Sequence, residues 1–364
     1  MTGNTLRGAL TDDETALVSW ETWDRVKHTE GFILLAAIIF VGLFSWLFAR
    51  APITSELGGY HSLARSIIVL TIFALGFNLL LGQTGLLSFG HAMFLGTGAY
   101  AVALFAIYVY SDPLVLVIVG TLFAVLLAFA TAFIVLRMHT VYFAIMTLAI
   151  AQMLFFIARE PAEAILGGYG GVRFIPEPLF GVIELRDPLP GIFGTLWGDY
   201  LYVFIAVFFI LVVVLIARIR KSPYGLIFKG IRENETRLQF VGLNVWRYKF
   251  AAYSISGGIV GLSGSLVAME SLFAGIDNLH WMTSGEVVVM TLLGGLGTIA
   301  GPILGALIFA YFEGVVDGVA IIGRYWLLML AVAFTAVVWK YPDGIWGFFK
   351  LIGQKIRSLT GDQQ

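Results

Sequence analysis

The sequence predicts an all-α fold: a polytopic membrane helix bundle of about ten transmembrane spans, with glycine-broken helices and a possible internal repeat. Composition is the first reason, because 59% of the 364 residues are hydrophobic and only 12% are charged, whereas soluble domains carry about 25% charged residues. The mean hydropathy of +0.91 points the same way. The third reason is that apolar runs of about 20 residues, the length that a helix needs to cross a bilayer, recur along the chain.

Eight apolar runs qualify as membrane spans. They cover residues 32–49, 66–81, 91–110, 113–136, 141–158, 200–217, 250–274 and 325–341. A further stretch, 286–316, is interrupted by glycines and is too long for one crossing at ~1.5 Å per residue. Counting 286–297 and 300–316 as two crossings brings the total to ten, with a buried re-entrant turn as the alternative for the first of the pair.

The basic segment 218–249 sets the expected orientation. It holds eight Lys or Arg residues against two acids, and short loops with that bias stay in the cytoplasm. Six predicted spans precede it and four follow it, so both termini are expected to be cytoplasmic in a multi-pass protein of the cell membrane. The predicted domains are a tail at 1–31, a transmembrane domain at 32–349 and a tail at 350–364. The first tail is polar and acidic, unlike a cleavable signal peptide.

The same count places residues 159–199 on the external side as the longest external loop. This loop has three basic and six acidic residues and a glycine-rich run at 167–171. Two interpretations remain open for it. It is either the surface that meets a substrate-delivering partner or a plain connector with local turns.

Two glycine-rich segments echo each other. Residues 82–87 (GQTGLL) open the apolar run that begins at His91, and residues 294–299 (GGLGTI) open the run that begins at Ala300. Both breaks are expected near the cytoplasmic side, each followed by a helix that runs outward. Because transporters often contain paired repeats with interrupted helices along the substrate path, the echo indicates a possible internal repeat.

No enzyme signature is present. A phosphate-binding P-loop needs a Gly-Lys pair, and no lysine follows a glycine here. The five histidines are dispersed without metal-ligand spacing, and the chain has no cysteine. We therefore expect no catalytic residues, no metal and no cofactor, and the net charge of −1 gives no sign of nucleic-acid binding.

Uncharged polar residues inside the spans are the better candidates for function, because such groups are costly in hydrocarbon unless they face a cavity or a partner. The predicted substrate-path residues are Asn78, Gln83, Thr84, Ser88, His91, Thr147, Gln152 and Gly297. Hydrogen bonding between helices is the alternative role for each of them. Glu270 and Glu286 are expected at solvated helix ends, and the Gly-x-x-x-Gly pairs at 257–261 and 301–305 are expected to pack helices closely.

The middle of the basic segment has the pattern of a short amphipathic helix. Ile231, Leu238 and Val241 fall at helical spacing, and Gly242 stands where a helix would end. A basic helix of this kind on the cytoplasmic face is suited to dock a soluble partner. The alternative is a solvated loop whose charges only set topology.

Four sequence blocks resemble the permease subunits of ATP-binding-cassette importers for branched-chain amino acids. They are 82–92 (GQTGLLSFGHA), 141–149 (VYFAIMTLA), the basic segment with RENE at 232–235, GLN at 242–244 and RYK at 247–249, and 294–306 (GGLGTIAGPILGA). The resemblance covers most of 66–347. Urea permeases share the same blocks, and the glycine-rich run at 167–171 departs from the Thr-Gly-Gly pattern that is usual in the family.

The resemblance implies a transport subunit that hydrolyses no ATP itself. Its implied partners are a second homologous permease, two cytosolic ATP-binding subunits, an extracytoplasmic solute-binding protein and membrane lipid. The implied ATPase-coupling residues are Arg232, Glu233, Glu235, Arg237 and Gly242. A permease for urea or short-chain amides is the close alternative. A stand-alone secondary transporter is a more distant one, since the span centres carry few of the carboxylates that a coupling-ion site would use.

Overall fold

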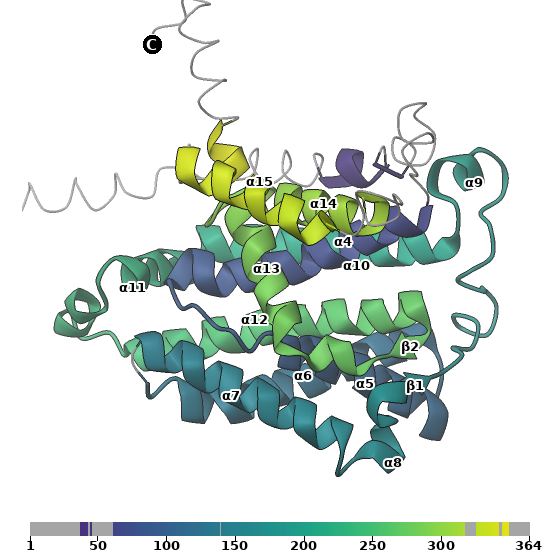
Figure 1. The fold of residues 1–364 in the computed structure, drawn as a ribbon, viewed down its shortest axis with the longest axis horizontal. Helices are drawn as coiled ribbons and strands as arrows, with labels where there is room; N and C mark the ends of the chain where they lie inside the picture. Colours follow the sequence, from purple (N-terminus) through teal and green to yellow (C-terminus); the bar gives the residue numbers. More distant parts are fainter. Residues whose placement is uncertain are drawn as a thin grey trace, which may run out of the picture.

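The computed structural model describes residues 37–42, 44–45, 61–138, 140–316, 325–341 and 344–348. Most of the described residues are helical, and most long helices run side by side along the long axis of the molecule (Figure 1). The predicted all-α bundle is therefore confirmed. The predicted tails at 1–31 and 350–364 lie outside the described residues, as does most of the first predicted span at 32–49.

The long elements follow the predicted apolar runs closely. They are α4 (His61–Asn78), the π-helical η1 (Leu79–Thr84), α5 (Ala92–Tyr108), α6 (Pro113–Val135), α7 (Thr140–Arg159), α10 (Tyr200–Lys221), α11 (Pro223–Phe240), α12 (Val245–Ser271), α13 (Trp281–Gly294), α14 (Ala300–Tyr311), the π-helical η4 (Phe312–Val316) and α15 (Trp326–Lys340). Among the described residues, five helices are long and apolar enough to cross a membrane: His61–Thr84, Pro113–Val135, Val141–Arg159, Tyr200–Lys221 and Val245–Ser271. Shorter apolar helices cover the predicted spans at 91–110, 300–316 and 325–341.

Helix α12 lies at the centre of the bundle and packs against α4, α5 and α6. Small residues make these approaches possible. A Cβ atom on Gly261 would lie 2.0 Å from the Cβ of Ala124 in α6, and a Cβ on Gly264 would lie 1.9 Å from the carbonyl oxygen of Leu95 in α5. The close packing predicted for the glycine pair at 257–261 is thus confirmed.

Helices α13 and α14 form a tight hairpin around a second set of glycines. A Cβ on Gly294 would lie 1.8 Å from the carbonyl oxygen of Gly301, and a Cβ on Gly305 would lie 1.7 Å from that of Met290. Helix α13 has 14 residues, about 21 Å at 1.5 Å per residue, which is less than the ~30 Å hydrocarbon core. It also runs across the direction of its neighbours in Figure 1. The re-entrant alternative therefore describes the predicted crossing at 286–297 better than a full span does.

Residues 159–199 fold into short elements at the end of the bundle opposite α11 (Figure 1). The segment contains α8 (Glu163–Leu166), η2 (Gly168–Gly170), β1 (Val172–Arg173) and α9 (Gly191–Trp197). Strand β1 pairs antiparallel with β2 (Phe273–Ala274), with Val172 opposite Ala274. The chain then passes through η3 (Ile276–Leu279) into α13. Residues 159–199 are thus joined by a sheet to the segment that leads into α13.

Candidate functional site

The first glycine break interrupts the path from α4 to α5. The π-helical turn η1 is capped by Gly85, whose φ of 76° lies in the left-handed region that favours glycine. Helix α5 starts only after His91, whose Nε2 lies 2.9 Å from the Ser256 hydroxyl. Since Ser256 is eleven residues beyond Val245, it lies about 17 Å along α12. Helix α5 therefore begins inside the bundle, as interrupted helices do in transporters.

The second glycine break lies directly against the first. The Asn78 side chain donates from Nδ2 to the carbonyl oxygen of Thr298 (2.7 Å), and its Oδ1 accepts from the backbone N–H of Gly297 (2.9 Å). Gln83 Nε2 donates to the Gly297 carbonyl oxygen at 3.2 Å. A Cβ on Gly82 would lie 2.7 Å from the Gly297 nitrogen, so only glycine allows this approach. The two segments that echo each other in sequence are in contact in space.

Arg232 of α11 reaches the place where the two breaks meet. One of its guanidinium nitrogens donates to the carbonyl oxygen of Gly82 at 2.7 Å. A Cβ on Gly297 would lie 3.3 Å from the same nitrogen, and a Cβ on Gly85 would lie 3.2 Å from the Arg232 Cγ. We call the contact of Asn78, Gly82, Gln83, Arg232 and Gly297 the break junction. Through it, the basic helix is bonded directly to the interrupted part of the bundle.

Helix α11 bends at Asn234 into two parts. Asn234 has φ −163° and ψ 100°, and its side-chain oxygen accepts from the backbone N–H of Arg237 at 3.0 Å, as an N-cap residue does. The second part ends at Gly242, which has φ 87° and donates its N–H to the Gln239 carbonyl oxygen. Glu235 pairs with Lys249 of α12 at 2.5 Å. The terminal part of α11 is thus a separate short helix with a fixed start and a fixed end.

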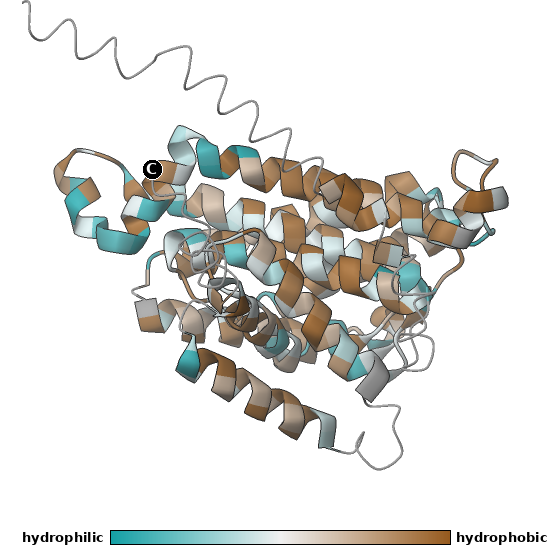
Figure 2. Cartoon of the chain, turned by 90° about the horizontal axis from the view of Figure 1, so that it is seen from above, coloured by the Kyte–Doolittle hydropathy of each residue, from teal (hydrophilic) through white to brown (hydrophobic). Residues whose placement is uncertain are grey.

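The tip of α11 exposes apolar side chains next to charged ones. Phe240 is 86% exposed and Val241 is 75% exposed, while the predicted coupling residues Glu233 and Arg237 are also exposed. Figures 1 and 2 show α11 projecting from one end of the bundle, largely hydrophilic and interrupted by hydrophobic residues. Large apolar side chains exposed on a polar projection are typical of surfaces that contact another protein or a membrane.

The other predicted path residues are spread over the neighbouring helices. Thr84 Oγ1 donates within its own helix to Leu80, and the Ser88 hydroxyl accepts from Gly90 N–H in a local turn. Thr147 of α7 accepts from the backbone N–H of Phe89 at 3.2 Å, which ties the first break to α7. Gln152 lies farther along α7, and within the described part of the chain its Nε2 has no hydrogen-bond partner. Neither Thr84 nor Gln152 belongs to the break junction.

His91 is packed rather than open to a cavity. Its ring stands edge-on to Phe77 at 4.9 Å and to Phe94 at 5.6 Å between ring centroids. The Ser256 hydroxyl donates to the carbonyl oxygen of Gly76 at 2.7 Å, so it accepts from His91 Nε2. Next to His91, the Ala92 N–H donates to the Ser284 hydroxyl at 2.8 Å. The start of α5 is thereby bonded to α12 and α13.

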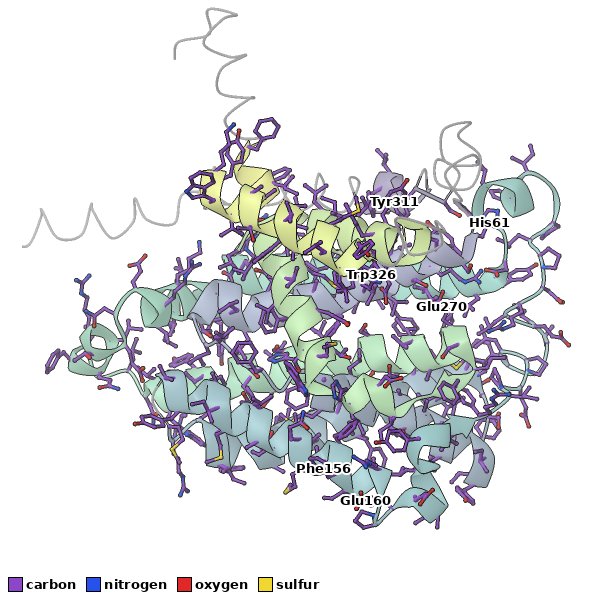
Figure 3. All side chains as sticks on the ribbon, in the orientation of Figure 1. His61, Phe156, Glu160, Glu270, Tyr311 and Trp326 are labelled. Atoms are coloured by element: carbon purple, nitrogen blue, oxygen red, sulfur yellow. The ribbon has the colours of Figure 1, made fainter. Side chains whose placement is uncertain are left out.

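The sequence predicts Glu270 at a solvated helix end, and this prediction is wrong. Glu270 is largely buried, and Figure 3 places it between α12 and α4. Its Oε1 accepts from the Ser66 hydroxyl at 2.9 Å and lies 3.8 Å from Arg65, which also pairs with Asp199. A cavity of about 340 Å³ opens beside it, lined also by Glu313. The apolar pattern gave no sign of this cluster, although a single arginine beside a predicted span was a possible signal.

One face of the bundle is formed by α7, α13 and α15. In Figure 1, α7 and α15 lie on either side of α13. Both flanking helices expose apolar side chains at helical spacing, such as Tyr142 and Ile145 on α7 and Leu328 and Val332 on α15. Figure 3 shows Phe156 of α7 at the edge of the same face. In the residues that the structure describes, no group of three His, Asp or Glu side chains is placed to hold a metal ion.

Comparison with known proteins gives one consistent family. The family described as "Branched-chain amino acid transport system / permease component" matches residues 59–338. The high-affinity branched-chain amino acid transport system permease protein LivM of Escherichia coli (strain K12) is 28% identical over 301 residues, which is 79% of this chain and 70% of the relative. Two probable branched-chain amino acid transport permease proteins of Methanocaldococcus jannaschii are each 23% identical: LivM, covering 68% of this chain and 78% of the relative, and LivH, covering 68% and 77%. No solved structure matches the chain significantly.

Proposed function

The chain belongs to the family of branched-chain amino acid transport permease components, and from this premise we propose how its parts serve an ATP-binding-cassette importer. It is a multi-pass membrane permease subunit of such an importer. The solutes are branched-chain amino acids, and the ATP is hydrolysed on partner chains. The end of the bundle that carries α11 faces the cytoplasm, together with both termini. This orientation follows from the excess of basic residues at 218–249.

The partners are assigned to three surfaces. Two cytosolic ATP-binding subunits serve the importer, one of them docking on the tip of α11. A second, homologous permease covers the face of α7, α13 and α15, so that the substrate path runs between the two permeases. The extracytoplasmic solute-binding protein meets the folded segment 159–199. The exposed apolar residues of the α11 tip support the first assignment, because this tip is otherwise polar. The second assignment is supported by α13, since a short helix that does not cross the bilayer needs other protein around it.

The observation that carries the mechanism is the hydrogen bond between Arg232 and Gly82. ATP binding draws the two ATPases together and moves the α11 tip. Because Arg232 is bonded to the first break, and Asn78 and Gln83 bond that break to Gly297, the movement reaches both interrupted helices at once. The access of the path then changes from one side to the other. The free energy comes from the different affinity of the ATPases for ATP in the two states.

Reconstitution tests this assignment of solute and energy source. Proteoliposomes that hold both permeases, the ATPases and the binding protein are expected to take up labelled leucine, isoleucine and valine only when ATP is present. Proteoliposomes with this chain alone are expected to take up none. Uptake of urea in place of leucine would contradict the assignment of branched-chain amino acids as the solutes. Uptake by the chain alone without ATP would contradict the assignment of the energy source to ATP hydrolysis on partner chains.

Phe240→Ser is expected to weaken docking of the ATPase subunits. Buried aromatic anchors contribute about 2 kcal/mol or more to an interface, which is about 30-fold in affinity. The fraction of the ATPases that co-purifies with the permease should fall accordingly, and uptake should fall with it. The matched control is Val182→Ser, which removes an 82% exposed apolar residue from the opposite end of the bundle. Wild-type co-purification by the Phe240 variant would show that the α11 tip is not the docking surface.

A further inference from the structure

A large apolar groove runs between α6, α10 and α12, away from the break junction. Its volume is about 810 Å³, within the range of about 300–1,000 Å³ that is usual for ligand pockets. Of its lining residues only Thr121 and Ser254 have polar side chains. Thr121 donates within its own helix, but within the described part of the chain the buried Ser254 hydroxyl has no partner. The groove therefore offers an almost wholly apolar channel.

The surroundings of the groove restrict what can fill it. All three helices that form it are long and apolar enough to cross a membrane, and Leu122 of α6 and Leu211 of α10, which line it, are exposed. The groove thus opens to the hydrocarbon phase, where acyl chains are the abundant apolar molecules. An apolar cavity of about 150 Å³ suffices for benzene, so this groove has room for a long chain of methylene groups.

The end of the groove nearest α11 is aromatic and basic. The rings of Phe129 and Phe250, which line the groove, are 5.3 Å apart, and Trp246 lies 5.2 Å from Phe250 between centroids. Tryptophan is enriched where a membrane protein meets the headgroups. Arg218 follows Leu215 by three residues on α10, and Arg247 precedes the lining residue Ala251 by four on α12. Both exposed arginines therefore continue the lining faces of their helices just beyond the apolar part.

We propose that this groove binds one phospholipid with an anionic headgroup. An acyl chain lies along α6, α10 and α12. The phosphate and the headgroup are held by Arg218 and Arg247, beside Trp246. Anionic lipids are attracted to basic residues at the membrane surface, and the apolar channel accounts for retention of the chain. The bound lipid holds the three helices together.

Native mass spectrometry of the full chain tests the proposal. The purified protein is equilibrated with equal amounts of phosphatidylglycerol and phosphatidylethanolamine, and the wild type is expected to retain one phosphatidylglycerol. Gly258→Phe should lose it, because a side chain at this position points into the groove, where the nearest atom to a Cβ is a methyl carbon of Val125. Leu126→Phe is the matched control, since Leu126 is an exposed residue of α6 that does not line the groove. Replacing both Arg218 and Arg247 with Gln should reduce the preference for phosphatidylglycerol about fivefold per arginine.

Three results would overturn the proposal. The first is a wild-type protein that retains no lipid. The second is a Gly258→Phe variant that retains as much lipid as the Leu126→Phe variant. The third is a cross-link from the groove to protein instead of lipid. If the Gly258→Phe variant does not fold, Leu211→Trp, at an exposed lining position of α10, is a second way to fill the groove and exclude the lipid. Because the chain has no cysteine, a cross-linker attached to the Leu211→Cys variant reacts at this position alone and identifies what lies beside it. A cross-link from this position to the second permease or to the N-terminal segment 1–36 would show that protein fills the groove.

Discussion

Arg232→Gln is expected to lower ATP-driven uptake at least about tenfold while the chain remains folded and bound to its ATPases. Hydrogen bonds from a charged donor contribute about 1.5–3 kcal/mol, and this one joins α11 to the carbonyl of Gly82 at the centre of the break junction. Without it, movement of the α11 tip no longer reaches the interrupted helices. The ATPases are expected to keep hydrolysing ATP, so the ratio of hydrolysis to uptake should rise.

The comparison that isolates this effect is Lys229→Gln, which removes a positive charge from an exposed position one turn earlier on α11. This control should retain uptake close to the wild-type rate. Arg232→Lys keeps the charge but not the planar guanidinium, and an intermediate rate is expected of it. Equal uptake by the Arg232→Gln variant and the wild type, measured per folded molecule, would show that force does not pass through this bond. Arg237, which is exposed, and Glu235, which also pairs with Lys249, both remain predicted ATPase-coupling residues.

Gly261→Ala is expected to destabilise the fold by about 3 kcal/mol, at the upper end of what overpacking costs. A Cβ at this position would lie 2.0 Å from the Cβ of Ala124, and the Gly261 carbonyl oxygen already lies 2.2 Å from where a Cβ on Gly98 would be. Helices α5, α6 and α12 approach one another here too closely to leave room for a side chain, so an added methyl group must push at least one of them away.

Yield of monodisperse protein and the midpoint of thermal unfolding measure this loss. Gly285→Ala is the matched control, because a Cβ on Gly285 would have no other atom within 4 Å. The control should unfold at the wild-type temperature or slightly above it, since alanine is favoured over glycine in helices. A Gly261→Ala variant as stable as the control would mean that the three helices are packed less closely than described.

The sequence predicted the helices better than their contacts. Apolar length alone located the spans, because a membrane helix must satisfy its own backbone and so needs a continuous apolar run. The same reasoning identified the breaks at 82–87 and 294–299 from their glycines. It could not predict that the two breaks touch, because their contact joins residues more than 200 positions apart, such as Gln83 and Gly297. Nothing local in either segment specifies the other as its partner.

The candidate site shows a similar limit. Asn78 was predicted as a path residue with interhelical bonding as the alternative, and both roles use the same amide, so the residue type alone could not separate them. Its two bonds to Gly297 and Thr298 favour the second role. The bend at Asn234 was missed, although asparagine before a helical segment is a familiar start signal. The apolar spacing of Ile231, Leu238 and Val241 concealed the bend, because this spacing fits one unbroken helix.

The pairing of β1 with β2 has a mechanical consequence for the whole subunit. Strand β2 continues through η3 into α13, and α13 ends at Gly294, next to the break that Asn78 and Arg232 hold. One short helix is therefore tethered at its start to the segment 159–199 and at its finish to α11. In the proposed importer, a solute-binding protein docked on segment 159–199 and an ATPase docked on α11 would act on opposite ends of this one helix. We therefore expect solute delivery and nucleotide binding to be coupled through α13, without any contact between the proteins that bring them.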